Sequence, residues 1–353
     1  MDEALLILPL DDVPLQRWLP SVGTTATKVE WMEEELTPQT DVIATSADTA
    51  SPWTVVVSDT NRFRVGDLLH IQGDLETNLY LVDSITNATT FELSSFGTTT
   101  NSDDPAADDV LEIVGQLRDE GGAPPDARSV ERDDLYNYTQ VVQEKVEASR
   151  SARKEAKYAL ADVYDHEVEK KFRELAIRFE RALMSGVRYK SGKKRSMGGF
   201  FYFFLNGDSE GSAQSRSGNA ASSKATLNAL LKDAWEAGGT PTTLFVAPNV
   251  KAAISANVDA ALRRSARTER QAGFVVDEFI SDFGTIDIIP NRYIPSKKGL
   301  LLQRDFNPRR PFDGIFHEML AKTVDGDQGQ IVGETSLEVK NRTAQGILTI
   351  TDA

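Results

Sequence analysis

The period at which apolar residues recur changes near residue 140, and this change divides the chain into two parts of different fold class. Upstream of it, Gly, Asn, Asp and Ser separate short apolar or alternating runs: TVVV from Thr54, DLLHI from Asp67, LYLV from Leu79 and TFEL from Thr90. Runs of this length and spacing are typical of a small all-β sandwich or barrel. We therefore predict an inserted β module over residues 41–115.

Downstream of the change the period is helical. In the stretch EVEKKFRELAIRFERALMSG, apolar residues recur every three or four positions and so form one face of a helix. Glu alternates with Lys and Arg on the other face, where pairs four residues apart support a helix. No proline interrupts residues 141–187. We predict one long helix there, with a possible earlier break and with Gly186 as its stop.

The rest of the C-terminal part mixes both kinds of element. Residues 188–222 are predicted as loops, since RYKSGKKRSMGG is basic and DSEGSAQSRSGNAASS is of low complexity. Helices are predicted for KATLNALLKDAWEAGG and PNVKAAISANVDAALRR, and strands for TTLFVAP, for residues 273–289 and 299–302, and for the C-terminal end. The order shows no regular βαβα alternation, so we predict an α+β fold rather than a doubly wound one.

Residues 1–40 lack the pattern of an independent domain. Prolines at positions 9, 14, 20 and 38 exclude a long helix, and Trp18 and Trp31 stand isolated. We predict an extended arm followed by a strand over residues 27–36. Such an arm is too apolar to stay in solvent and too irregular to form its own core, so we expect it to pack on something else, often a neighbouring subunit.

Charge is distributed unevenly. Residues 1–140 carry 27 acidic and 7 basic side chains, hence −20, whereas residues 141–353 carry 27 acidic and 32 basic, hence +5. The asymmetry either favours solubility or lets copies of the chain meet acidic half to basic half. Net acidity argues against tight wrapping of nucleic acid by the whole chain. The absence of Cys suits a reducing cytosol, and no apolar run is long enough for a membrane span.

Several short motifs fail the tests of their context. Asp282-Phe283-Gly284 matches the DFG of protein kinases, but no glycine-rich loop, strand lysine or HRD loop accompanies it, so we predict a turn that opens a strand. GVRYKSGKK has the wrong spacing for a phosphate-binding loop, DGDQGQIVGE the wrong spacing for a calcium loop, and HEMLA lacks the second histidine of a zinc protease. We predict no catalytic residue, no bound cofactor and no metal site.

The order of several segments resembles the major capsid (major head) proteins of tailed bacteriophages, whose shell fold is shared with encapsulins. These segments are EW at residues 30–31, NYTQVV at 137–142, TLFVAPNVKAAIS, VVDEFISDFGTIDIIPNRYIP, HEMLAKT and GETSLEVKNRTAQGILTI. The resemblance covers most of the chain and is strongest from about residue 137 to 350. None of the segments is specific alone, whereas their order and spacing together are.

The resemblance implies a division of the chain. It implies an N-terminal arm, an extended loop that lies over a neighbouring subunit, a peripheral domain with a long spine helix, and an axial domain at the five-fold and six-fold axes. The corresponding residues are 1–26 for the arm, 27–40 and 116–140 for the extended loop, 41–115 for the inserted β module, 141–222 and 299–353 for the peripheral domain, and 223–298 for the axial domain.

The resemblance also implies a function. The expected role is structural: self-assembly as pentamers and hexamers into an icosahedral head shell, formed in the host cytoplasm and carried in the virion. Expected partners are other copies of the chain, portal and scaffolding proteins, and double-stranded DNA bound without sequence preference, with cement or decoration proteins as further candidates. The candidate subunit contacts are Trp18, Trp31, Glu33, Glu34, Glu35, Lys170, Lys171 and Arg173.

Two other functions are considered. An encapsulin-like compartment that encloses cargo enzymes would use the same fold. An enzyme would need a concave cluster of acids assembled from distant positions, and no local spacing suggests one. We also consider that the charged candidates only form a face in contact with solvent and bind no neighbouring subunit.

Overall fold

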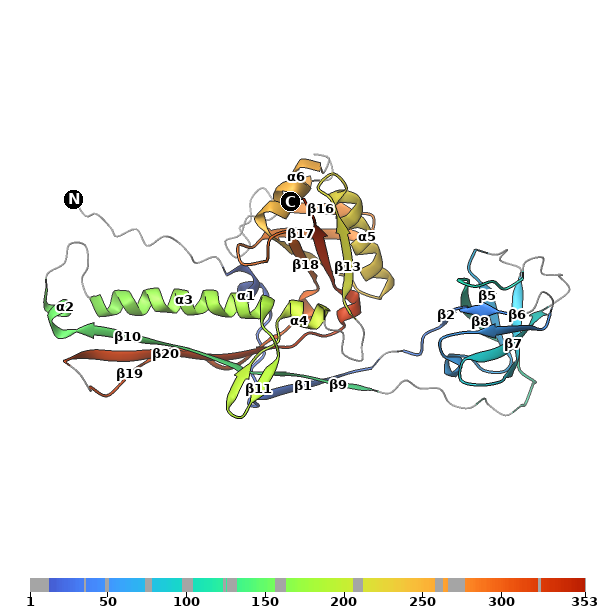
Figure 1. Cartoon of the computed structure of the whole chain (residues 1–353), viewed down its shortest axis with the longest axis horizontal. Helices are drawn as coiled ribbons and strands as arrows, with labels where there is room; N and C mark the ends of the chain where they lie inside the picture. The colour runs from blue at the N-terminus through green and yellow to red at the C-terminus, as the bar shows by residue number, and fades with distance from the viewer. Residues whose placement is uncertain are drawn as a thin grey trace. The chain divides into compact units, whose positions relative to one another are not determined.

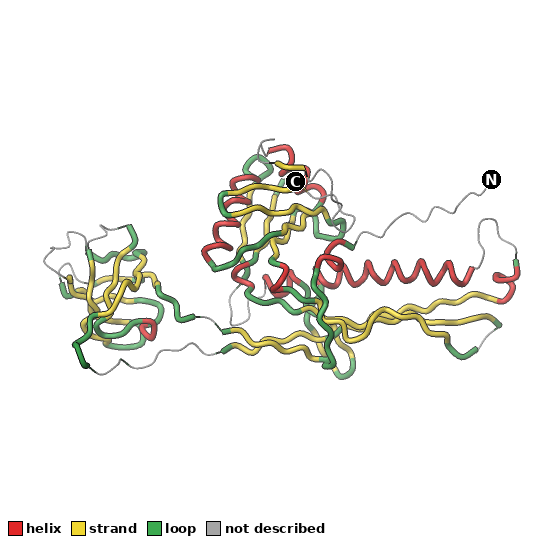
Figure 2. The backbone as a smooth tube through the Cα atoms, turned by 180° about the vertical axis from the view of Figure 1, so that it is seen from behind, coloured by secondary structure: helices red, strands yellow, loops and turns green. Residues whose placement is uncertain are grey.

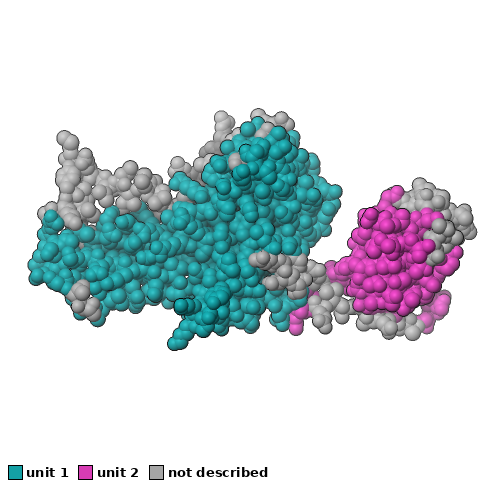
Figure 3. All heavy atoms as spheres, viewed as in Figure 1, with its two compact units in different colours: residues 1–33, 133–353 teal, residues 34–132 magenta. Residues whose placement is uncertain are grey.

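The computed structural model describes residues 13–34, 36–47, 51–73, 78–96, 104–122, 125, 132–155, 163–205, 212–257, 263–265, 277–322 and 325–352. The chain divides into two compact units (Figure 3). Unit 1 comprises residues 1–33 and 133–353, and unit 2 comprises residues 34–132.

Unit 2 is a single antiparallel sheet that closes on itself. Its strand order is β2-β8-β5-β6-β7-β4-β3, so strands β2 and β3, which follow each other in the chain, stand at opposite ends of the order. The segment between them supplies the closure, because the Ile43 N–H donates to the Asp109 carbonyl (2.8 Å) and the Ala44 N–H to the Val56 carbonyl (2.7 Å). The strands are β2 (Thr40–Val42), β3 (Thr45–Ser46), β4 (Trp53–Val56), β5 (Asp67–Ile71), β6 (Leu79–Ile85), β7 (Thr90–Phe96) and β8 (Val110–Gln116), with a 3₁₀ turn η1 at Thr60–Arg62.

A separate hydrophobic core fills unit 2. Alternate residues of its strands point inward, as a strand with one buried face requires, and Trp53 meets Tyr80 edge to face at 5.6 Å. Three of the four runs that the sequence analysis quoted lie in strands β5, β6 and β7, and the run from Thr54 extends one residue beyond the end of β4. Unit 2 also extends beyond the predicted bounds of 41–115 on both sides.

The centre of unit 1 is a mixed seven-stranded sheet, with α5 and α6 packed against it (Figure 1). Its order is β13-β21-β18-β14-β17-β16-β15, so strands from before and after the predicted axial segment 223–298 join the same sheet. The predicted boundary at residue 298 therefore does not coincide with a break in the fold. The elements are β13 (Gln214–Gly218), α5 (Ser223–Glu236), β14 (Thr243–Val246), α6 (Pro248–Asn257), β15 (Arg263–Ser265), β16 (Asp277–Ser281), β17 (Gly284–Pro290), β18 (Lys298–Leu302) and β21 (Gly346–Ile350).

A second layer of unit 1 is long and narrow. Helix α3 (Val163–Ser185) lies along a three-stranded antiparallel sheet of order β10-β20-β19 (Figures 1 and 2). The strands are β10 (Gln140–Ser149), β19 (Arg309–Met319) and β20 (Gly326–Leu337). A 3₁₀ turn, η3 (Arg304–Phe306), precedes β19, and a second, η4 (Arg342–Ala344), follows β20. The predicted helix is confirmed over α3, and residues 156–162 lie outside the described part.

The helix prediction is wrong for residues 141–149, which form strand β10. Val142 and Val146 are buried and four residues apart, a spacing that fits a helix as well as a strand. The strand is stabilised by pairing with β20 over ten consecutive residues. The first helix after it is the short α2 (Arg150–Lys154). Ser149 caps this helix, because its hydroxyl accepts a hydrogen bond from the Ala152 N–H (3.2 Å).

Close packing of α3 on the sheet depends on a glycine. A Cβ atom at Gly333 of β20 would lie 3.1 Å from the Phe179 ring of α3 and 2.9 Å from Ile315 of β19. Glycine at this position therefore lets the helix approach the sheet.

Two smaller pieces complete unit 1. Strands β1 (Lys28–Glu33) and β9 (Asp133–Tyr138) form an antiparallel ribbon in which Glu33 pairs with Asp133, so unit 2 is inserted between two neighbouring strand ends. The strand predicted over residues 27–36 is thus shorter than expected, since β1 ends at Glu33. The hairpin of β11 (Tyr189–Ser191) and β12 (Lys194–Ser196) follows α3.

The predicted loop 188–222 is wrong in part. The hairpin occupies its basic stretch, and the aromatic run forms helix α4 (Phe200–Leu205). Phe200, Phe203 and Phe204 stand at helical spacing and are buried, because the helix inserts into the core of unit 1 on more than one side.

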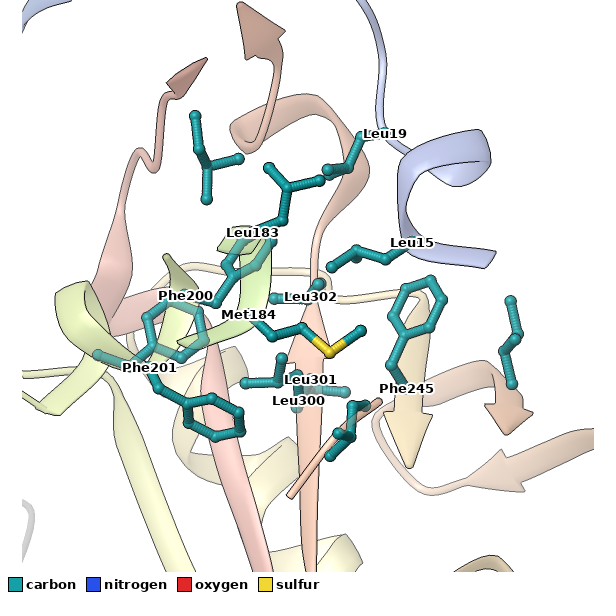
Figure 4. Packing of buried hydrophobic residues seen from close by; sticks show 14 of the residues in the cluster. Leu15, Leu19, Leu183, Met184, Phe200, Phe201, Phe245, Leu300, Leu301 and Leu302 are labelled. Atoms are coloured by element: carbon teal, nitrogen blue, oxygen red, sulfur yellow. The ribbon is translucent and has the colours of Figure 1, made fainter. Parts of the chain in front are cut away.

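One hydrophobic cluster joins the layers of unit 1 (Figure 4). Leu183 and Met184 of α3 lie beside Phe200 of α4 and the three leucines of β18, Leu300 to Leu302. Leu15 of the short helix α1 (Pro14–Trp18) enters the same cluster. The described start of the arm is therefore part of the core of its own chain.

Candidate assembly surfaces

Helix α1 is attached to α3 through one buried carboxylate. Glu180 Oε1 accepts from the Leu15 N–H (2.8 Å) and from Asn291 Nδ2 (2.7 Å), and Glu180 Oε2 accepts from the Gln16 N–H (2.9 Å). Gln16 in turn donates through Nε2 to the Ala176 carbonyl (2.6 Å). These contacts satisfy first-turn N–H groups of α1, which a helix leaves without intrahelical partners.

The same carboxylate has a shifted pKa. Burial disfavours the charged form and raises the pKa of Glu180 above its ordinary value, although the donors from Leu15, Gln16 and Asn291 oppose the shift. Nothing in the local spacing of α3 distinguishes Glu180 from its exposed acidic neighbours, so the sequence analysis missed it.

Asn137 joins three elements and was also missed. Its Nδ2 donates to the carbonyls of Gly198 (3.0 Å) and Leu337 (2.7 Å), and its Oδ1 accepts from the N–H groups of Gly198 (2.8 Å) and Tyr138 (2.9 Å). The side chain is fully buried and uses its full donor capacity. It thereby fixes the end of the ribbon against the end of β20 and the segment after the hairpin.

The two tryptophans among the candidate contacts lie on the core of unit 1. Trp31 is buried, meets Phe203 edge to face at 6.0 Å and donates through Nε1 to Glu33 (2.8 Å). Trp18 is half-buried and meets Phe245 edge to face at 5.2 Å. Both therefore have a role within the chain, and a contact to a second copy stays a prediction.

The acidic candidates differ among themselves. Glu33 is occupied within the chain, since it accepts from Trp31 and also from the Asn341 N–H (3.0 Å). Glu34 is exposed in unit 2, and Glu35 lies outside the described residues.

The basic candidates of α3 are paired within unit 1. Lys170 lies 3.9 Å from Glu167, Lys171 2.7 Å from Glu174 and Arg173 2.6 Å from Glu169. The hydrogen bond that Lys171 donates to Glu174 raises the pKa of Lys171. The ion pairs expected along the helix from the sequence are therefore present. They engage the basic side chains that the sequence analysis assigned to a contact with a neighbouring subunit. Their pairing with Glu33, Glu34 or Glu35 stays a prediction.

The DFG tripeptide is a turn, as predicted. It connects β16 to β17, with Gly284 at φ 138° and Asp282 accepting from Asn228 of α5 (3.1 Å). Phe283 is exposed at this turn and lies 6.1 Å from the exposed ring of Trp235. The tripeptide thus contributes Phe283 to an aromatic pair with Trp235 of α5 on the surface.

Strand β19 is an edge strand of the three-stranded sheet. Residues 20–24 cover its first part, since the Val22 N–H donates to the Arg309 carbonyl (2.9 Å) and the Thr24 N–H to the Pro311 carbonyl (3.0 Å). In the described part of the chain no strand pairs with this edge beyond Pro311, and Phe316 and Met319 are exposed there. An open edge with apolar side chains is a surface on which another chain can add.

One histidine of the described residues lies between strand β19 and helix α3. This residue, His317, meets the Tyr164 hydroxyl (2.9 Å). Within the described residues there is no group of three or more His, Asp or Glu side chains that could hold a metal ion. No helix among those residues is long and apolar enough to cross a membrane.

Comparison with solved structures identifies the fold. The capsid of the empty GTA particle matches with a TM-score of 0.51 at 9% identity, covering 96% of this chain and 90% of the other. The capsid of the native GTA particle matches with a TM-score of 0.50 at 10% identity, covering 97% and 90%. The SrpI encapsulin of Synechococcus elongatus PCC 7942 is more distant, with a TM-score of 0.47 at 15% identity over 62% of this chain and 76% of that one.

Comparison of sequences identifies the family. No curated protein matches the chain. The family described as SU10 major capsid protein matches residues 1–352. A match over this range includes both units, and the fold agrees with it. The chain belongs to the SU10 major capsid protein family and is a building block of a phage head shell.

Proposed function

We propose that the chain assembles as pentamers and hexamers into a closed icosahedral shell around packaged double-stranded DNA. The observation that carries this proposal is the family match over residues 1–352 on a capsid fold. The surfaces described above support it, because an open strand edge and exposed aromatic side chains gain stability when a neighbour covers them.

Within this proposal the parts of the chain take the roles implied by the resemblance. The seven-stranded sheet with α5 and α6 is the axial domain, and α3 with the three-stranded sheet is the peripheral domain with its spine helix. The β1–β9 ribbon starts the extended loop, and unit 2 is the module inserted in it. The axial sheet includes residues 214–218, 298–302 and 346–350, so we revise the proposed limits accordingly.

The proposed partners follow from the same role. They are further copies of the chain, portal and scaffolding proteins, DNA held without sequence preference, and decoration proteins on the outside. Assembly in the host cytoplasm agrees with the absence of Cys. We propose a purely structural role, without a catalytic site.

The test is size-exclusion chromatography with negative-stain electron microscopy of the full chain, alone and with its scaffolding protein. Closed particles, or rings with five-fold and six-fold symmetry, are the expected result. A protein that stays monomeric in both conditions would refute the proposal. Particles that copurify with an enzyme cargo in place of DNA would instead support the encapsulin-like alternative.

A further inference from the structure

Nearly all of the net charge of the chain resides in unit 2. Residues 34–132 contain 19 acidic and 5 basic side chains, hence −14, and no lysine, whereas the whole chain carries −15. In the proposed shell each copy of the chain adds this charge to the particle, and like charges repel. A basic surface on another part of the chain would offset this repulsion.

The basic candidates of α3 are poorly suited to this role, because Lys170, Lys171 and Arg173 already pair with glutamates of the same helix. The β11–β12 hairpin is different. Lys190, Lys193 and Lys194 are exposed on it, and in the part of the chain that the structure describes no carboxylate forms an ion pair with any of the three. Residues 188–195 contain five basic side chains and no acidic one.

The base of the hairpin is held firmly, so its lysines are presented from a fixed support. Arg188 stacks over the Tyr136 ring at 4.2 Å and donates to the Tyr136 carbonyl (3.0 Å). Arg195 pairs with Glu334 of β20 at 2.8 Å. The two arginines therefore anchor the hairpin, and among the described residues the three lysines have no carboxylate partner.

The hairpin lies at the far end of the ribbon from the attachment of its own unit 2. Lys190 stands over the Tyr138 ring at 5.3 Å, and Tyr138 pairs with Lys28. Unit 2 departs at the opposite end, where Glu33 pairs with Asp133. Five residues of strand separate the two ends by about 17 Å. The hairpin and the attachment of unit 2 thus lie at opposite ends of the ribbon, and in the proposed shell we consider the unit 2 of another copy as the partner.

We propose that the β11–β12 hairpin binds the acidic surface of unit 2 of a neighbouring copy through Lys190, Lys193 and Lys194. The inference rests on the proposed shell and names a contact within it. In this contact between copies, the basic residues come from the hairpin and not from α3. Contacts of this kind steer and orient association, and salt weakens them.

The test uses the full chain labelled with ¹⁴N or ¹⁵N, mixed in equal amounts before assembly and treated with a zero-length carbodiimide crosslinker. We expect mixed-isotope crosslinks between hairpin lysines and acidic residues of unit 2. Because K193E/K194E also removes two of the reactive amines, the crosslinks of Lys190 are the readout, and reversing the two neighbouring charges should reduce them about tenfold. The matched control K154E/K232E changes the net charge equally on exposed helical positions and should leave them unchanged.

Three outcomes would overturn the inference. They are the absence of mixed-isotope hairpin crosslinks in shells and in free subunits, crosslinks that form only within one copy, and Lys190 crosslinks that are undiminished in K193E/K194E. A K193E/K194E protein that assembles normally without nucleic acid but no longer retains DNA would assign the hairpin to phosphate binding instead, which also overturns it. Microscopy reports shells independently of the crosslinks, so particles without crosslinks refute this contact and leave the proposed function standing.

Discussion

Replacement of Asn137 by alanine should strongly destabilise unit 1. The substitution removes four hydrogen bonds, and it leaves buried groups of Gly198 and Leu337 without the partner they have now. At a net contribution of about 0.5–1.5 kcal/mol for each bond, the loss is roughly 3–4 kcal/mol, after allowing for water at the partly exposed Tyr138. A domain stability of about 5–15 kcal/mol makes such a loss easy to measure.

Urea denaturation provides the assay, followed by the circular dichroism of the α-helices, which among the described residues belong to unit 1. The matched control is N228A, which removes one hydrogen bond from a half-buried asparagine of α5 and should cost less than about 1 kcal/mol. If N137A and N228A had the same free energy of unfolding, the ribbon, the hairpin and β20 would not depend on the Asn137 network, and the reasoning would be wrong.

Three further predictions concern the core of unit 1. Valine at Gly333 meets Phe179 and should cost about 1–3 kcal/mol in denaturation experiments, whereas G314V, where a Cβ has open space, should cost little; equal losses would contradict the packing argument. W31A should cost about 3–5 kcal/mol in an unassembled chain, and a loss seen only in assembled particles would instead make Trp31 a subunit contact. Burial raises the pKa of Glu180, so the native chain holds this proton more tightly than the unfolded chain, and stability should fall as pH rises from 4.5 to the raised value. E180Q should lack this fall, and parallel urea midpoints of the two proteins from pH 4 to 7 would exclude the effect.

The sequence predicted the elements whose period is unambiguous. Helices α3 and α5 have one apolar face over several turns, and the runs of unit 2 alternate with turn residues at short spacing. It failed where one pattern fits two structures. Val142 and Val146 suit a helix or a strand, and only pairing with β20, almost two hundred residues later, decides for β10.

The candidate contacts could be predicted only as residue types. Charges on α3 look available in the sequence, whereas their neighbours Glu167, Glu169 and Glu174 already engage them. Conversely, Asn137 and Glu180 look like ordinary polar residues, because their importance comes from donors and acceptors that distant segments bring to them. The hairpin lysines gained significance only once these internal pairs were known.

The most direct test of the capsid account is an electron cryomicroscopy reconstruction of particles formed by the full chain. The account predicts a closed icosahedral shell of pentamers and hexamers, with the seven-stranded sheet near the symmetry axes and α3 with its three-stranded sheet in the wall. Open or amorphous assemblies, or a closed shell into whose wall this fold cannot be placed, would contradict it.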